Sequence, residues 1–181
     1  MKNKTIWYNR FKNKTSQSLQ KIGSSIHIDK RLYEQDIAAS IVHSQMLMKQ
    51  KIIKSEDGNK IINGLKKIKA QIDKGNFDFK DKYEDIHLNI EKALFEIIGP
   101  SAGFLHTARS RNDQVVTDFK LWIKEASNEI IKVISIVMKN LIKKAEKNTD
   151  TVMPGLTHLK NAQPISFAHY LLSYYEMLKR D

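Results

Sequence analysis

Apolar residues recur every three or four positions along most of this chain, which is the spacing of side chains on one face of an α-helix. Two such runs come early, at residues 29–51 and 55–74, and the short distance between them favours an αα-hairpin. Asp29 is a suitable N-cap for the first helix. A third run covers residues 83–98 and ends at Gly99-Pro100, because proline cannot continue a helix.

The longest helical pattern covers residues 112–147 and predicts a helix of about 54 Å, since each residue adds about 1.5 Å. Its apolar positions form a stripe too wide for one neighbouring helix to cover: Phe119, Leu121, Trp122, Ile123, Ala126, Ile130, Ile131, Val133, Ile134, Val137, Met138, Leu141 and Ile142. We therefore expect several further helices to pack around it, from missing sequence, from other subunits, or from both. A last helical pattern starts at Pro164 and is still periodic at Asp181.

These patterns predict an all-α fold in two parts. The first is a small N-terminal helical domain at residues 1–108. The second, at residues 109–181, is the start of a domain built from a bundle of long helices, which we expect to be incomplete because the last pattern has no C-cap. No segment of the chain shows an alternating pattern that would predict a β-strand.

Composition narrows the possible chemistry. The chain has 41% hydrophobic and 28% charged residues, as soluble globular proteins do. It has no cysteine, so a disulfide framework, a thiol nucleophile and a cysteine metal site are excluded. Its six histidines are dispersed, so we expect no bound metal. No apolar run approaches the roughly 18 residues of a membrane helix, and no secretory signal is visible, so we expect a cytoplasmic protein with no membrane partner.

The net charge of +11 is the one compositional argument for a nucleic-acid partner. The lysines, however, are scattered through the helical segments and do not form a basic stripe with interleaved aromatic residues. We therefore expect a lysine-coated solvent surface and no bound nucleic acid. A basic helical nucleic-acid binder remains the alternative, and salt-dependent retention on DNA would favour it.

Residues 105–114, here called the Arg-Ser-Arg segment, are the most chemically dense part of the chain. They combine the guanidinium groups of Arg109 and Arg111 with several hydroxyl and amide side chains, directly before the longest helix. A guanidinium grips a carboxylate with two parallel hydrogen bonds, and a helix N-terminus favours anions. The segment thus predicts a binding site for a small polycarboxylate. A capped helix start with surface arginines is the alternative interpretation.

A second polar group, Thr157-His158 with Gln163, follows a Pro-Gly pair in the next loop. A histidine beside a hydroxyl residue on a constrained loop could transfer a proton, although a loop histidine more often makes an ordinary hydrogen bond. A lone histidine, His87, lies beside the apolar stripe of the third helix, where histidines are usually structural. We find no phosphate-binding glycine loop and no nucleophile-elbow motif.

The Arg-Ser-Arg segment resembles the His-Thr-Gly-Arg-Ser-Arg-Asn-Asp-Gln signature of the argininosuccinate lyase family, within the fumarase/aspartase superfamily. Ala108 stands where that family has glycine. Residues 153–164 are similar to the family's Pro-Gly-Tyr-Thr-His-Leu-Gln-x-Ala-Gln-Pro, with a leucine and a lysine at two positions. Residues 84–87 and 24–29 also match in order, and residues 7–11 resemble its Trp-Gly-Gly-Arg-Phe without the glycines.

The resemblance implies a fold, a reaction and an assembly. Members cleave argininosuccinate to arginine and fumarate by β-elimination, in arginine biosynthesis, without a metal or an organic cofactor, and act as homotetramers with helical bundles. Carried over to this sequence, the substrate-binding residues would be Ser25, Arg111, Asn112 and Thr157. His158 would be the catalytic histidine, either as a proton acceptor or as the partner that orients one.

The resemblance also implies that part of the site lies elsewhere. The family's catalytic serine is on a mobile Gly-Ser-Ser loop much further along, which these 181 residues do not contain. We therefore expect an N-terminal fragment without lyase activity of its own, and the identity of the base stays open. A different class of function is also possible, because lens crystallins related to this family keep the fold as non-catalytic helical scaffolds.

Overall fold

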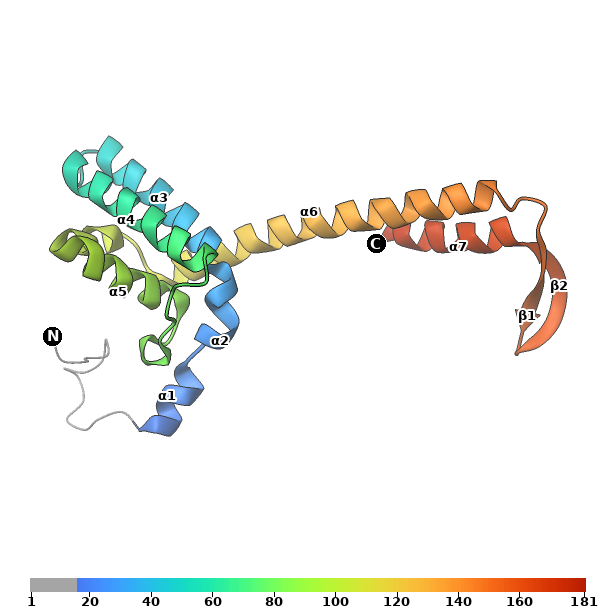
Figure 1. Cartoon of the computed structure of the whole chain (residues 1–181), viewed down its shortest axis with the longest axis horizontal. Coiled ribbons are helices and arrows are strands. Elements are labelled where there is room, and N and C mark those ends of the chain that lie inside the picture. The colour runs from blue at the N-terminus through green and yellow to red at the C-terminus, as the bar shows by residue number, and fades with distance from the viewer. Residues whose placement is uncertain (1–15) are drawn as a thin grey trace. The chain divides into compact units, whose positions relative to one another are not determined.

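The structure is a computed structural model that describes residues 16–181 (Figure 1). Helices dominate it, which confirms the all-α prediction. The match at residues 7–11 lies outside the described residues. In chain order the elements are α1 (Gln17–Gly23), α2 (Ile26–Asp29), η1 (Lys30–Leu32), α3 (Tyr33–Lys49), α4 (Ser55–Asp73), η2 (Asp81–Tyr83), α5 (Ile86–Ile98), η3 (Gly99–His106), α6 (Arg111–Glu146), β1 (Val152–Thr157), β2 (Lys160–Ser166) and α7 (Phe167–Arg180), where η marks a 3₁₀ helix.

The chain divides into two compact units, Met1–Trp122 and Ile123–Asp181. In the first unit α3 and α4 form the predicted αα-hairpin, and α5 packs against it (Figure 1). Fully buried aliphatic side chains join these helices: Ile37, Leu47, Ile61, Leu65, Ile68, Ile86, Ile90 and Leu94. The helices approach closely at Gly64, where an added Cβ would lie 2.5 Å from Leu94 Cδ1.

The third helix begins later than its apolar pattern predicts, at Ile86. Residues 81–83 form a 3₁₀ turn, and Glu84 has a φ of 63°. Asp85 then caps α5, because its Oδ1 accepts a hydrogen bond of 2.6 Å from Leu88 N. The positive φ at Glu84 breaks the helix that the periodicity alone would continue.

Asp29 does not cap a helix with its side chain, so that prediction is wrong. Its Oδ1 instead accepts a hydrogen bond of 3.2 Å from Ile86 N, which lies far away in the sequence. A long-range partner of this kind leaves no trace in local spacing. The consequence is that residues 24–29 are attached to the start of α5.

The second unit contains a β-hairpin that the sequence did not predict. Strands β1 and β2 pair antiparallel from Val152↔Ser166 to Thr157↔Lys160. Pro164, expected in the first turn of a helix, lies inside β2, and α7 begins at Phe167. Proline and glycine are disfavoured in strands, so the local composition gave no sign of this hairpin. Among the described residues the sheet has only these two strands.

Two interactions hold α7 in place in the second unit, one with the hairpin and one with α6. Ser166 Oγ accepts a hydrogen bond of 3.1 Å from His169 N and so caps the helix. A small core of Ala145, Ala168 and Leu171 then packs α7 on the end of α6. None of the helices in residues 16–181 combines the length and the apolar character that a membrane span requires.

Helix α6 has 36 residues, close to its predicted bounds. Many apolar side chains along it stay exposed, and Ile130, Ile131, Val133 and Ile136 each keep about three-fifths of their surface. The described residues therefore leave the wide stripe of this helix largely uncovered, as the sequence led us to expect.

Candidate active site

The Arg-Ser-Arg segment connects η3 to α6 through an unusual backbone turn. Ala108 has a φ of 54°, in the left-handed region where an L-residue other than glycine is strained. The adjoining Thr107 carbonyl accepts a hydrogen bond of 3.0 Å from His43 Nε2 on α3. The positive φ explains why glycine suits this position in the lyase signature that the segment resembles. The two arginines that follow the turn have different orientations.

Arg109 points into the protein. Its side chain is only 8% exposed, its Nη1 donates a hydrogen bond of 2.8 Å to Ser40 Oγ, and its Nη2 lies 4.0 Å from Asp36 Oδ1. This guanidinium therefore holds the segment onto α3. Only one of the two arginines is left for a substrate, which the residue pattern alone could not reveal.

Arg111 begins α6 and stays partly exposed, at 27% of its side chain. Its Nη2 lies 2.9 Å from Glu91 Oε1, and its Nε lies 3.6 Å from Asp85 Oδ2. Its Nη1 donates to Gln114 Oε1. The next residue, Asn112, is exposed, and its backbone N donates to Ser110 Oγ at 3.3 Å. The acidic neighbours contact the guanidinium and offset part of its charge.

Ser25 lies at the same end of α5 as Arg111. Its backbone N donates a hydrogen bond of 2.8 Å to the Glu84 carbonyl, and its Oγ donates one of 2.6 Å to Asp29 Oδ2. Burial raises the pKa of Asp29, an effect that the Ser25 hydrogen bond partly opposes. Ser25 contacts Glu84, and Arg111 contacts the next residue, Asp85. Ser25 and Arg111, two of the predicted substrate-binding residues, therefore both lie at the N-terminal end of α5.

Behind this surface lies a buried polar cluster on α3, α5 and α6. His87 is 1% exposed, and its Nδ1 lies 3.0 Å from Asp36 Oδ1 and 3.5 Å from Asp118 Oδ2. Gln114 Nε2 donates a hydrogen bond of 2.6 Å to the same Asp36 oxygen. His87 is thus buried and hydrogen-bonded, as the structural interpretation of this residue requires.

The cluster perturbs its own acid–base groups. Burial alone would lower the pKa of His87, but the hydrogen bond and negative charge of Asp36 raise it above its ordinary value. Burial alone would raise the pKa of Asp36, but hydrogen bonds from His87 and Gln114 leave it lowered. Burial, together with the Asp36 charge, raises the pKa of Asp118 to about 7.

Thr157 and His158 belong to the second unit, at the turn of the β-hairpin. Thr157 pairs with Lys160, so His158 and Leu159 form the turn, with φ values of 50° and 62°. Positive φ at both positions is the geometry of a type I′ turn, which normally uses Asn-Gly. Thr157 and His158 are exposed, and the His158 ring makes no hydrogen bond with another described residue. The predicted site residues are therefore divided between the units.

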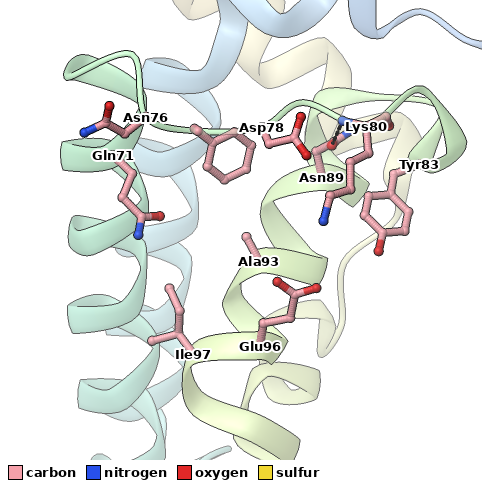
Figure 2. A pocket seen from close by; sticks show the side chains of 10 residues that line it. Gln71, Asn76, Asp78, Lys80, Tyr83, Asn89, Ala93, Glu96 and Ile97 are labelled. Atoms are coloured by element: carbon pink, nitrogen blue, oxygen red, sulfur yellow. Dashed lines mark hydrogen bonds between the residues drawn. The ribbon is translucent and has the colours of Figure 1, made fainter.

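A cavity of about 220 Å³ lies elsewhere in the first unit, between the end of α4 and α5 (Figure 2). Asn89 shapes its rim, because its side chain accepts a hydrogen bond of 2.8 Å from Lys80 N and donates one of 2.9 Å to the Asp85 carbonyl. Gln71 and Glu96 also line it. None of the predicted site residues does, so the cavity is separate from the candidate active site.

Comparison with known proteins places the chain and its fold in one class. The family model described as lyase matches residues 9–181. The chain belongs to this lyase family. An EDDS lyase variant with bound fumarate has a similar structure, with a TM-score of 0.73 and 28% identity, over 84% of this chain and 30% of that one.

The curated relatives narrow the class. The argininosuccinate lyase of Pelagibacter ubique (strain HTCC1062) is 56% identical over 179 residues, which is 99% of this chain and 39% of that protein. The argininosuccinate lyase of Bartonella bacilliformis is 48% identical over 176 residues, or 97% of this chain and 38% of that protein. The chain thus spans about two fifths of the length of these relatives.

Proposed function

We propose that this chain contributes to an argininosuccinate lyase, which cleaves argininosuccinate to arginine and fumarate. The observation that supports the proposal most is the 56% identity to an argininosuccinate lyase across nearly the whole chain. The match includes the Arg-Ser-Arg segment, where the described geometry leaves the Arg111 guanidinium partly exposed beside Asn112. The reaction breaks a C–N bond by β-elimination and needs no oxidant or reductant.

The chemistry asks for three kinds of group. A base removes a proton from the carbon next to a carboxylate, and the resulting aci-carboxylate must be stabilised by preorganised donors. An acid must then protonate the guanidinium leaving group. We assign His158 to proton transfer, as the acceptor or as the group that orients it. The two-residue turn places the backbone of His158 at a positive φ, at the tip of the hairpin.

We assign substrate contacts to Ser25, Arg111, Asn112 and Thr157. Arg111 suits a substrate carboxylate because its guanidinium is planar and always charged, and Glu91, Asp85 and Gln114 together hold it in one orientation. A substrate carboxylate must compete with Glu91 and Asp85 for the guanidinium, which weakens substrate binding. The Ser25 hydroxyl, fixed by Asp29, can still accept a hydrogen bond.

We further propose that copies of α6 from other subunits cover its exposed apolar face, in a homotetramer. The support is the size of that face, since Ile130, Ile131, Val133 and Ile136 are each about three-fifths exposed. A contiguous apolar face of this kind is typical of a protein interface. The expected cytoplasmic location and the absence of an organic cofactor, a metal, a nucleic acid or a membrane partner are retained as parts of this proposal.

The proposal is tested by joining residues 1–181 to the remaining part of the Pelagibacter ubique relative and measuring fumarate release from argininosuccinate. We expect activity in the joined protein and none from the 181-residue chain alone. His158→Asn in the joined protein should lower kcat by at least about 10², as the loss of an acid–base group does. His169→Asn, at an exposed position on α7, is the matched control and should leave the rate unchanged.

Two results would contradict the assignment. An inactive joined protein that is folded and assembled, beside an active parent relative, would remove this chain from the argininosuccinate lyases. An unchanged rate in His158→Asn would remove that histidine from proton transfer while leaving the overall reaction in place.

A further inference from the structure

The junction of α3, α5 and α6 contains two carboxyl groups that the proposed reaction does not use. Asp36 is 1% exposed and Asp118 is fully buried. Both approach the same ring nitrogen, His87 Nδ1. Water cannot stabilise either charge, so the protein must supply the compensation. More distant charges also act here, since Asp85 and Arg111 influence the His87 ring through space.

The hydrogen-bond donors of the cluster lie closer to one of the two acids, Asp36, than to the other. Gln114 donates a hydrogen bond of 2.6 Å to Asp36, His87 Nδ1 lies 3.0 Å from it, and the nearest Arg109 nitrogen lies 4.0 Å away. By contrast, neither oxygen of Asp118 has a hydrogen-bond partner among the described residues. An ionised Asp118 would therefore be a buried carboxylate without donors, next to a second negative charge.

We propose that Asp36 and Asp118 hold one proton between them, mainly on Asp118, and that the ionised Asp36 positions the Arg111 guanidinium through the Gln114 amide. The remaining negative charge of Asp36 is balanced by the Arg109 guanidinium and by the hydrogen bond with His87, whose pKa this charge raises. The directions of the two pKa changes agree, because the pKa of Asp36 is lowered and that of Asp118 is raised.

The contacts form a continuous path to the surface. Asp36 Oδ1 accepts from Gln114 Nε2, and Gln114 Oε1 accepts from Arg111 Nη1. A charged acceptor fixes which way the amide points, since only its nitrogen can donate. Neutralising Asp36 would allow the amide to turn and its oxygen to leave Arg111. Only the importance given to Arg111 rests on the proposed function, and the path itself does not.

A divalent cation is the competing explanation for the cluster. The ligand atoms of Asp36, His87 and Asp118 lie within 4.8 Å of one another. A dication would, however, add two positive charges beside the Arg109 guanidinium and beside the His87 ring, whose pKa is already raised above its ordinary value. The shared proton therefore accounts for the two buried carboxyl groups without an added ion.

The protonation is tested by carbon NMR of the 181-residue chain labelled at the aspartate carboxyl carbons. We expect one aspartate to titrate near neutral pH, and this titration to disappear in Asp118→Asn, which keeps the shape and the donor of the protonated acid. Asp113→Asn, at an exposed position of the same helix, is the control and should leave it unchanged. Titration of every aspartate in the ordinary acidic range would overturn the shared proton.

The positioning is tested by the Nε–H signal of Arg111 in the same chain. We expect the signal to persist in Asp118→Asn and to broaden or vanish in both Asp36→Asn and Gln114→Ala. Gln114→Ala keeps both acids, so it decides the question even if Asp36→Asn does not fold. An unaltered signal in Gln114→Ala would overturn the positioning role.

Both readouts are independent of catalysis, so a failure of the proposed lyase function would leave them interpretable. Addition of Zn²⁺ or Mg²⁺ to the unmodified chain distinguishes the rival explanation. We expect no change in the Asp36 and Asp118 signals. A saturable shift of both would overturn the shared proton in favour of a cation site.

Discussion

Ala108→Gly is expected to stabilise the first unit, because Ala108 has a φ of 54°. An L-residue in the left-handed region costs about 1–2 kcal/mol, which glycine avoids. Glycine in turn costs about 0.5–1 kcal/mol, because it has more freedom to lose on folding. The net gain should be about 0.5–1 kcal/mol, or about 2 °C in the unfolding midpoint of a chain of this size.

The matched control is the same substitution at a helical position, Ala70→Gly. Ala70 is exposed in the interior of α4, so its replacement should destabilise the unit by about 1 kcal/mol. Urea unfolding followed by Trp122 fluorescence is a suitable assay, because Trp122 packs against the core of the first unit. Trp7→Phe in both variants and their reference removes the second tryptophan. Destabilisation by Ala108→Gly as large as that by Ala70→Gly would show that the backbone strain argument is wrong.

Three further predictions concern packing, pH and assembly. Gly64→Ala should destabilise the first unit by about 1 kcal/mol in urea unfolding, because overpacking against Leu94 outweighs the better helix propensity. Unchanged stability would mean that α4 and α5 can move apart at no cost. Stability should fall as pH rises from about 5 to 8, measured by urea midpoints. His87 has a raised pKa, so its contribution to the free energy of unfolding is present below pH 6.5 and is lost as pH rises through the folded pKa. The pKa of Asp118 is raised from 3.8 to about 7, so its contribution is also lost as pH rises between these values. A urea midpoint that increases with pH would refute both signs. Ile131→Glu should shift the joined protein from tetramers to smaller species in sedimentation, since it places a charge in the exposed apolar face of α6, and an unaltered tetramer would exclude that face as the interface.

Helical periodicity was sufficient to predict most of this fold, because the helices of the first unit bury continuous aliphatic stripes. Where it failed, the decisive interaction was either a backbone angle or a contact between distant residues. Glu84 interrupts a helical pattern with a positive φ that no neighbouring glycine announces. The β-hairpin was missed because His158-Leu159 replaces the usual turn pair and Pro164 lies in a strand. Neither fact can be derived from spacing.

The sequence identifies the residues of the candidate site but not how each side chain is oriented. A motif that resembles a lyase signature identifies Arg109 and Arg111 together, because both are arginines in one segment. Their side chains differ in orientation, because Arg109 is turned towards Ser40 while Arg111 stays partly exposed, with Ala108 at a positive φ just before them. The proton-transfer role of His158 and the contacts assigned to Thr157 still rest on the proposed function.

At the start of α6, the buried side chains are polar and not those of the apolar stripe. Its apolar stripe includes Phe119, yet that side chain is half exposed, while Gln114 and Asp118 are buried in the first unit. Gln114 and Asp118 are four residues apart and therefore lie on one helix face. That face is turned inward because its polar groups meet Asp36 and His87, whose own burial would otherwise be unfavourable. The first turns of α6 therefore bury a polar face in the first unit and leave an apolar side chain, Phe119, exposed to solvent.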